Sequence, residues 1–287
     1  MNFLAIDVET ANPDMASICQ IGFVIYNDGK LVEEWKTFLD PEDYFDINNV
    51  SIHGISESDV RKSPKFPDVY KFLKEKLEKY ICICHTHFDW VSLNQVCNKY
   101  ELSTIENKWL DTAKVSRRCW SEFAQKGYGL KNVCNKLGFT FKHHDALEDA
   151  KASAFILLTA MKEKNYTIDE WMLSVNRPIT KPKSYSYENI KGNPDGDLYG
   201  EVMVFTGKLQ IERKNAQRMA ADIGCDVIKN VTKETTILVV GDRDIKFDNP
   251  KSNKHQKAEK YISNGLNIKI LQESDFLALF ELIEKTP

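Results

Sequence analysis

The stretch that most constrains the fold stands at the start of the chain, where residues 3–10 (FLAIDVET) read as a strand that ends in two carboxylates. Side chains alternate between the two faces of a strand, so Asp7 and Glu9 are expected on the same face. Two like charges beside an apolar run are costly unless a cation or a buried partner compensates them. An isolated pair of this kind is more often two surface acids, and the rest of the chain decides between the two interpretations.

Apolar alternation predicts that this strand opens an antiparallel meander. Residues 18–26 and 31–39 read as the next two strands, and Asn27-Asp28-Gly29 between them is a hairpin turn signal. Strand or helical spacing predicts the remaining elements of this part of the chain, which are a helix over 67–80, a strand and a helix over 80–96, a strand and a helix over 106–123, and helices over 128–138 and 143–158.

Acidic side chains stand at the ends of several of these elements. They are Asp7, Glu9, Asp89 and Asp149, and His144 lies five residues before the last of them. Oxygen ligands in this number are the ones that hard cations such as Mg²⁺ or Mn²⁺ select. Two such ions can stabilise the attacking and the leaving oxygen of phosphodiester hydrolysis, and a histidine beside them can act as general base. The spacing therefore indicates a metal-dependent phosphodiesterase.

Local helix chemistry offers another explanation for some of the acids. Asp89 stands where the N-cap of the following helix is expected, which is a common role for aspartate. Asp145 and Glu148 fit a capping box, in which an acid before the helix and a glutamate three residues later bond to the backbone. These local roles leave His144 and Asp149 as the groups that can face the end of the first strand.

Three motifs taken together resemble a known family. Residues 7–10 (DVET), 88–89 (FD) and 144–149 (HDALED) resemble, in this order, the exonuclease motifs of the DnaQ-like, or DEDDh, family. The resemblance covers roughly residues 1–165, and the stretches QIGFV, IHGIS and LDT between the motifs are similar to the family's connecting signatures. It implies an α/β, ribonuclease H-like fold with a mixed sheet flanked by helices, and release of nucleotides from a 3′ end by two-metal hydrolysis.

The resemblance also implies a role for each site residue. Two divalent metal ions, Mg²⁺ or Mn²⁺, would be held by four carboxylates, which are those of Asp7, Glu9, Asp89 and Asp149. Asp7 would bridge the two ions, and His144 would be the general base. Contacts to the substrate near its 3′-terminal nucleotide would come from Thr10, His53 and Phe88.

The chain departs from the family pattern at two places. Many relatives have His-Asn upstream of the second motif, where this chain has Cys84 and His85. This difference bears on the expected substrate preference more than on the expected activity. The tandem His143-His144 leaves two registers for the third motif, and the spacing to Asp149 favours His144 as the base.

The character of the chain changes after the first domain. Residues 177–197 contain three prolines and two glycines with little periodicity, which is typical of an interdomain linker. Strand and helix patterns then alternate, which favours a small parallel sheet with helices packed on it. The predicted domains are an exonuclease domain over 1–171, a linker over 172–197 and a second α/β domain over 198–287. The second domain's strands are predicted over 198–206, 237–240 and 268–271, and its helices over 212–223, 254–263 and 273–284.

Three stretches of the second domain resemble a BRCT domain of the kind found in DNA ligases and in the large subunit of replication factor C. They are FTG at 205–207, ADIGC at 221–225 and LVVG at 238–241, and the resemblance covers about residues 198–284. It implies a site for a DNA 5′-phosphate or a phosphorylated partner, made by Thr206, Gly207, Arg213 and Lys257. Chemistry alone also allows a tight turn and a solvated lysine face at this place.

Composition narrows the setting rather than the function. The net charge of −3 gives no global basic signature, so contact with nucleic acid has to come from local patches or from metal ions. The 7 cysteines are odd in number and form no C-x-x-C, which favours reduced thiols in a cytosolic setting. The sequence has no signal peptide and no apolar run of about 18–20 residues. We therefore expect a soluble, cytoplasmic protein without a membrane partner.

The leading hypothesis is a metal-dependent 3′→5′ exonuclease that releases nucleoside monophosphates from DNA. Its BRCT domain would recruit it to DNA ends or to protein partners in replication or repair. An RNA-trimming exonuclease shares the chemistry and is the first alternative. The second alternative is a non-catalytic adaptor for DNA ends or phosphoproteins, which could lose the metal carboxylates, but all four and the histidine are present in this chain.

Overall fold

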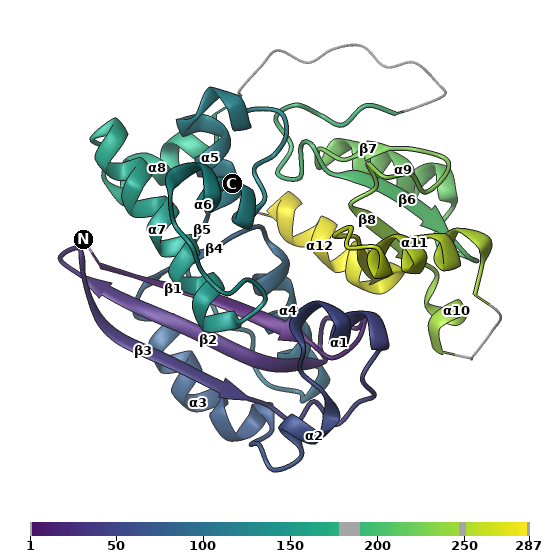
Figure 1. The fold of residues 1–287 in the computed structure, drawn as a ribbon, viewed down its shortest axis with the longest axis horizontal. Coiled ribbons are helices and arrows are strands. Elements are labelled where there is room, and N and C mark those ends of the chain that lie inside the picture. Colours follow the sequence, from purple (N-terminus) through teal and green to yellow (C-terminus); the bar gives the residue numbers. More distant parts are fainter. Residues whose placement is uncertain (1, 178–189, 247–250, 286–287) are drawn as a thin grey trace. The chain divides into compact units, whose positions relative to one another are not determined.

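The computed structural model describes residues 2–177, 190–246 and 251–285 (Figure 1). The chain divides into two compact units, Met1–Arg177 and Pro178–Pro287, and each unit is described by itself. None of the helices in the described parts is both long enough and apolar enough to cross a membrane.

The first unit is built on a mixed five-stranded sheet. The predicted meander is confirmed: β1 (Asn2–Thr10), β2 (Ile18–Asn27) and β3 (Lys30–Phe38) pair antiparallel. On the other side of β1, β4 (Ile81–Cys84) and β5 (Trp109–Asp111) run parallel to it, which gives the order β3-β2-β1-β4-β5. The carboxyl ends of β1, β4 and β5 therefore lie at one edge of the sheet, where α/β sheets bind their ligands.

Helices cover both faces of this sheet. They are α1 (Ile47–His53), α2 (Glu57–Val60), α3 (Phe66–Leu77), α4 (Phe88–Lys99), α5 (Thr112–Cys119), α6 (Leu130–Leu137), α7 (Ala146–Lys164) and α8 (Ile168–Val175), with a short 3₁₀ turn at Ser121–Phe123. Phe3 and Ala5 of β1 are buried in the core that α5, α6, α7 and α8 share. Leu4 and Ile6 are buried on the opposite face with residues of α3 and α4. The alternation continues along the strand, so Asp7 and Glu9 share the α7 face, as the period-2 pattern predicts.

The start of α7 comes unusually close to β2, directly beside the two acids. Asp7 is paired with Gly22, and Glu9 with Gln20, so all four residues share one face. The Gln20 side chain accepts a hydrogen bond from the Ala146 backbone N–H at 2.8 Å. A Cβ at Gly22 would lie 2.3 Å from the backbone nitrogen of Leu147, so only glycine permits this approach.

We expect Gly22→Ala to lower the free energy of unfolding by about 1–3 kcal/mol, because the added methyl group must push the α7 backbone away. The shift would carry the acid on the first turn of α7 away from β1 and lower any activity that depends on both. Urea unfolding measures the first effect. Gly129→Ala is the matched control, since no atom lies within 4 Å of a Cβ at Gly129. A wild-type midpoint for Gly22→Ala would contradict the close approach.

The capping box predicted for α7 does not form. Asp145 occupies the N-cap position, but its side chain makes no capping hydrogen bond. Its carboxylate accepts two hydrogen bonds from Lys36 Nζ instead, at 2.8 and 3.0 Å. Glu148 pairs with Lys151 at 3.1 Å. That prediction is wrong because a tertiary partner, Lys36 on β3, outcompetes the local backbone for the carboxylate.

The second unit contains the small parallel sheet that alternation predicts. Its strand order is β7-β6-β8-β9, and all three pairings are parallel. Phe276, which lies near the place where many BRCT domains carry a tryptophan, is fully buried and packs edge-on against Phe205 at 5.3 Å. The strands are β6 (Val202–Thr206), β7 (Asp226–Val227), β8 (Ile237–Val240) and β9 (Lys269–Gln272), and the helices are α9 (Arg213–Asp222), α10 (Asp242–Lys246), α11 (Asn253–Ser263) and α12 (Glu273–Lys285). Alternation did not predict β7 and α10, which are the shortest strand and helix of this unit.

The predicted linker over 172–197 overlaps ordered structure at both ends. Helix α8 continues to Val175, and residues 178–189 lie outside the described residues. Ile190 forms a β-bridge with Val227. A Cβ at Gly196 would lie 2.4 Å from the backbone nitrogen of Gly224. The segment that precedes β6 is thus packed into the second unit, whereas the predicted domain limits stay a prediction.

Candidate active site

Three acidic side chains from two elements converge at the carboxyl edge of the first sheet. Asp7 and Glu9 stand on β1, and Asp149 stands in the first turn of α7. One oxygen of each of these three carboxylates can be chosen so that all lie within 4.8 Å of one another. The structure therefore brings together three of the four predicted metal carboxylates, which come from sequence positions up to 142 residues apart (149 − 7).

The chemistry of this cluster suits a divalent cation. Asp149 is buried, and its Oδ1 atom has no hydrogen-bond partner among the described residues. Burial raises the pKa of the Asp149 carboxyl, although a hydrogen bond with His143 opposes the shift. Buried carboxylates that gather without neutralising cations are costly. Hard oxygen ligands of this kind fit Mg²⁺ or Mn²⁺.

Asp89 of α4 is hydrogen-bonded to the backbone of β1 between Asp7 and Glu9. It is the second residue of α4, whose N-cap position is taken by His87, so the N-cap role considered for Asp89 is wrong. Its Oδ1 atom accepts a hydrogen bond from the Val8 backbone N–H at 3.0 Å. Val8 stands between Asp7 and Glu9 on β1. Asp89 is thereby fixed next to the two acids of β1.

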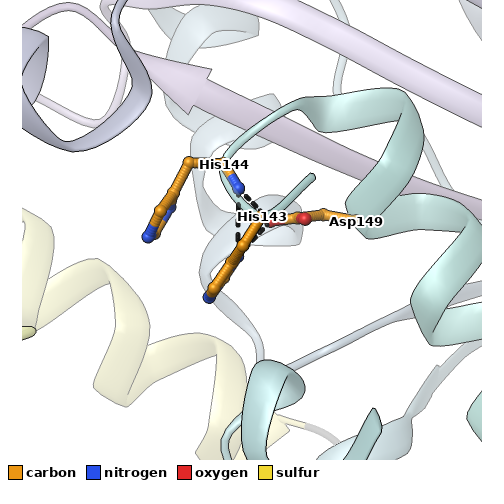
Figure 2. A group of neighbouring side chains, drawn as sticks. All are labelled: His143, His144 and Asp149. Carbon is orange, nitrogen blue, oxygen red and sulfur yellow. Dashed lines mark hydrogen bonds and ion pairs between the residues drawn. The ribbon is translucent and has the colours of Figure 1, made fainter. Parts of the chain in front are cut away.

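The tandem histidines occupy two different places (Figure 2). Nδ1 of His143 lies 3.0 Å from Asp149 Oδ2, and 19% of its side chain is exposed. Nδ1 of His144 lies 3.9 Å from Glu9 Oε1, and 28% of its side chain is exposed. His144 is thus the histidine that borders the acid cluster on its open side, where a general base has to meet water. His143 also contacts the cluster, at Asp149, so the choice of His144 as the base stays a prediction.

The predicted substrate contacts fall around the end of β1. The Thr10 carbonyl accepts hydrogen bonds from His53 Nε2 at 3.1 Å and from Asn49 Nδ2 at 2.9 Å. Nδ1 of His53 accepts from the Ile55 backbone N–H at 3.0 Å, so both ring nitrogens are used within the protein. Burial also lowers the pKa of His53, which favours the neutral ring. His53 therefore shapes the Thr10 backbone, and direct contacts of Thr10, His53 and the buried Phe88 with a nucleotide stay a prediction.

His85, which replaces an asparagine of the family pattern, is an internal hydrogen-bonding residue and not a surface loop residue. Its Nε2 donates to the Tyr128 carbonyl at 2.8 Å, and its Nδ1 pairs with Thr112 Oγ1 at 2.8 Å. Burial lowers the pKa of His85, although the nearby Asp111 opposes this shift. The imidazole therefore joins the loop before α4 to the start of α5 and to the segment before α6.

Asp111 is a residue whose role the sequence did not reveal. It is the last residue of β5, and its Oδ1 atom accepts from the backbone N–H groups of Thr86 at 2.9 Å and Ala113 at 2.7 Å. Burial alone would raise the pKa of Asp111, but His87 and His85 lower it well below its usual value. One buried carboxylate thus fixes the loop that presents Asp89. The only sequence signal was its place in the LDT signature at 110–112.

The candidate phosphate site of the second unit is only partly assembled by the predicted residues. Thr206 ends β6, and its hydroxyl lies 2.6 Å from Ser252 Oγ. Gly207 follows in the left-handed region with φ 76°, and its carbonyl accepts from Arg213 Nη2 at 2.6 Å. Thr206, Gly207 and Arg213 therefore lie together at the end of this strand.

Two lysines of α11 lie near this end of β6, and the predicted role of Lys257 in a phosphate site stays a prediction. Lys257 Nζ lies over the Tyr261 ring, 5.6 Å from the ring centre. Lys254, one turn earlier on α11, donates to the Phe205 carbonyl at 3.1 Å. Burial lowers the pKa of Lys254, and the neighbouring Arg213 lowers it further. The resemblance to BRCT domains led to Lys257, and Lys254 lies one turn before it on the same helix.

A carboxylate already occupies the turn that follows Thr206. Asp244 of α10 accepts a hydrogen bond from the Lys208 backbone N–H at 2.8 Å. A Cβ at Gly207 would lie 2.0 Å from the same carboxylate oxygen, so the absence of a side chain there is what lets Asp244 approach. An anion that binds at this turn has to compete with Asp244.

Comparisons with known proteins find a family for each of the two units. Residues 4–157 match the family model described as Exonuclease, and residues 193–280 match that of the BRCT (BRCA1 C Terminus) domain. The chain is similar to DNA polymerase III PolC-type of Thermotoga petrophila, with 29% identity over 160 residues, or 54% of this chain and 12% of the relative. The corresponding Bacillus subtilis protein is 25% identical over 166 residues, or 56% of this chain and 11% of the relative. The chain is thus similar to a small part of each of these relatives.

Solved structures share the fold of the first unit. A structure of exonuclease I covers 62% of this chain and 44% of its own, with a TM-score of 0.54 and 15% identity. A zinc-bound E. coli exonuclease I complex with single-stranded DNA covers 62% and 46%, with a TM-score of 0.51 and 16% identity. The mixed sheet with carboxylates at its strand ends defines a DnaQ-like exonuclease fold, as predicted. The chain belongs to the exonuclease family: a DEDDh-type 3′–5′ exonuclease domain is followed by a BRCT domain.

Proposed function

We propose that this protein removes nucleoside monophosphates from the 3′ end of DNA with the help of two divalent ions, Mg²⁺ or Mn²⁺. The observation that carries the proposal is the cluster of Asp7, Glu9 and Asp149, in which a buried Asp149 oxygen lacks a protein partner among the described residues. His144 borders the cluster at Glu9. An arrangement of acids around a basic ring is what metal-dependent phosphodiester hydrolysis requires.

Each residue has a defined task in this proposal. Asp7, Glu9, Asp89 and Asp149 would hold the ions, which when bound supply Lewis-acid stabilisation of the phosphoryl oxygens. His144 would take a proton from the attacking water at a ring nitrogen, because its ring is both beside Glu9 and open to solvent. Thr10 would border the 3′-terminal nucleotide, since His53 and Asn49 fix its backbone.

DNA is the preferred substrate in this proposal for two reasons. The relatives named above are DNA polymerases, and the accompanying BRCT domain resembles those of DNA ligases, which suggests a role in DNA replication or repair. RNA trimming is the alternative, since the cluster itself does not select the sugar. A non-catalytic adaptor would have no reason to keep a gathered set of acids that costs free energy without a cation.

Digestion of 5′-labelled DNA and RNA oligonucleotides with Mg²⁺, Mn²⁺ or EDTA tests the proposal. We expect a ladder that shortens from the 3′ end of DNA, requires the divalent ion and disappears in EDTA. A stronger ladder on RNA would replace DNA by RNA as the substrate. The absence of a ladder on either polymer, with a folded protein, would support the adaptor instead.

We further propose that the BRCT domain binds a 5′-phosphate at a DNA end or a phosphorylated partner. The support is the grouping of Thr206, Gly207 and Arg213, with Lys254 at the Phe205 carbonyl and the predicted Lys257 one turn further along α11. A phosphate would have to displace the Asp244 carboxylate from the Lys208 N–H. The site would therefore bind a phosphate weakly as long as Asp244 is ionised.

We expect Asp244→Asn to raise the affinity for 5′-phosphorylated DNA by about tenfold, because it removes a negative charge next to the incoming phosphate. Fluorescence anisotropy in EDTA, which prevents cleavage, measures this affinity. The same oligonucleotide with a 5′-hydroxyl is the control and should bind both proteins equally. Equal affinity of the variant and the unmodified protein for the phosphorylated probe would rule out competition by Asp244.

A further inference from the structure

His143 contacts the acid cluster but has no place in the chemistry proposed above. Its Nδ1 atom lies 3.0 Å from Asp149 Oδ2 (Figure 2). An ionised carboxylate only accepts hydrogen bonds, so beside ionised Asp149 the hydrogen of the His143 ring lies on Nδ1. With the hydrogen on Nε2, Nδ1 would instead accept from the His144 backbone N–H, which lies 3.0 Å away. The backbone N–H of His144 lies 3.2 Å from Asp149 Oδ2. Two consecutive residues thus direct donors at one atom of Asp149.

This arrangement gives the two oxygens of Asp149 different environments. Oδ2 has two donors, whereas Oδ1 is buried and has no hydrogen-bond partner among the described residues. Rotation about the last side-chain bond would exchange the two oxygens, and the donors on Oδ2 oppose that rotation. Donors of this type fix the orientation of a metal-binding side chain and thereby the direction of its remaining lone pairs.

The ring of His143 also supports His144. The two imidazoles are stacked, with their centres 3.8 Å apart and their planes 7° apart. The backbone of His144 is in the left-handed region, with φ 65°, which is uncommon outside glycine and is typical of functional sites. Phe141, two residues before His143, packs against the His143 ring, with the two ring centres 5.6 Å apart. The stacked ring therefore limits where the His144 side chain can turn.

We infer that His143 is a positioning residue of the exonuclease site, with two separable effects. Through its Nδ1–H it holds Oδ2 of Asp149 and so fixes the orientation of this carboxylate, which strengthens the binding of divalent ions. Through its ring it holds the imidazole of His144 beside Glu9. This inference rests on the proposed function, because it assigns His143 to the same site.

Two substitutions separate the effects. His143→Phe keeps a ring that can stack on His144 but removes the donor, and His143→Asn keeps a donor near the position of Nδ1 but removes the ring. We expect His143→Phe to weaken Mn²⁺ binding by about 10–100-fold, as measured by isothermal titration calorimetry on the full chain. We expect His143→Asn to bind Mn²⁺ within about threefold of the unmodified protein, while its kcat on DNA at saturating Mn²⁺ falls by about tenfold.

Lys142→Ala is the control, because Lys142 belongs to the same turn, its side chain is 77% exposed, and it pairs with Asp145 at 3.9 Å and not with an acid of the cluster among the described residues. It should change neither quantity. Mn²⁺ affinity of His143→Phe equal to that of the unmodified protein would overturn the inference, as would an equal loss in both variants. If the unmodified protein binds Mn²⁺ but cleaves neither polymer, the proposed function fails, and the calorimetric comparison still decides the role of His143 toward Asp149. Absence of Mn²⁺ binding by the unmodified protein would overturn both.

Discussion

Replacing Asp7 by asparagine should reduce metal-dependent cleavage of DNA by at least about 10³-fold. Asp7 lies with Glu9, on its own strand, and Asp149, on α7, so its carboxylate would help to hold the ions. Loss of metal-ion stabilisation at the reacting phosphate is worth several kcal/mol, and about 4 kcal/mol corresponds to 10³-fold. The measurement is the initial rate on a 5′-labelled oligonucleotide at saturating Mg²⁺ or Mn²⁺.

The same substitution, which should lower the cleavage rate, should not lower the stability of the metal-free protein. Without metal, asparagine removes one of three acids that lie together, so the Tm of Asp7→Asn in EDTA should equal or exceed that of the unmodified protein. Mn²⁺ should raise the Tm of the unmodified protein much more than that of the variant, since only a bound ion stabilises the folded state. Asp145→Asn is the control: its acid pairs with Lys36, so it should leave the rate within a few-fold. An active Asp7→Asn, or one that unfolds in EDTA, would contradict this assignment.

Strand and helix periodicity in the sequence predicted the features of the site that depend on local geometry. The face shared by Asp7 and Glu9 follows from alternation, and the order of the three motifs places Asp149 one turn into a helix. The resemblance to the exonuclease family then supplied the partners of these acids. The structure confirms the mixed sheet and the parallel sheet that the patterns and the two resemblances predict.

Tertiary contacts decided what local patterns could not. Asp145 and Glu148 have the spacing of a capping box, yet Lys36 of β3 takes the first acid, and Gln20 of β2 caps α7 in its place. No local rule connects residues more than 100 positions apart. Likewise, the closeness of α7 to β2 depends on the missing side chain of Gly22, which in the sequence is one glycine of a strand pattern.

The sequence also could not show which side chain of α11 reaches the end of β6. Lys254 and Lys257 stand on one helix, and both are cations with the correct approximate position. Only the packing of α11 against β8 settles that Lys254 reaches the end of β6 while Lys257 lies on Tyr261. The tandem His143-His144 posed a similar question: the two rings are stacked, and each lies beside a different acid.

Replacing His144 by glutamine should lower kcat by about 10²–10⁴-fold, which is the range for loss of a general base. Glutamine keeps a polar side chain of similar reach but cannot accept a proton from water. The ions are held by carboxylates, so Mn²⁺ affinity of His144→Gln should stay close to that of the unmodified protein in calorimetry. The loss would therefore appear in kcat and not in metal binding.

The pH dependence separates a missing base from a distorted site. At higher pH, hydroxide replaces the base that His144→Gln lacks, so the variant's rate should rise steadily with pH and recover part of the loss. The Asp7→Asn variant lacks metal binding and should gain little from the same change. The contrast with His143→Asn is also informative, since that variant keeps its base and should show the pH profile of the unmodified protein at a lower rate. A His144→Gln enzyme with unchanged kcat would remove the base assignment and leave His143, bound to Asp149, without a neighbour to position.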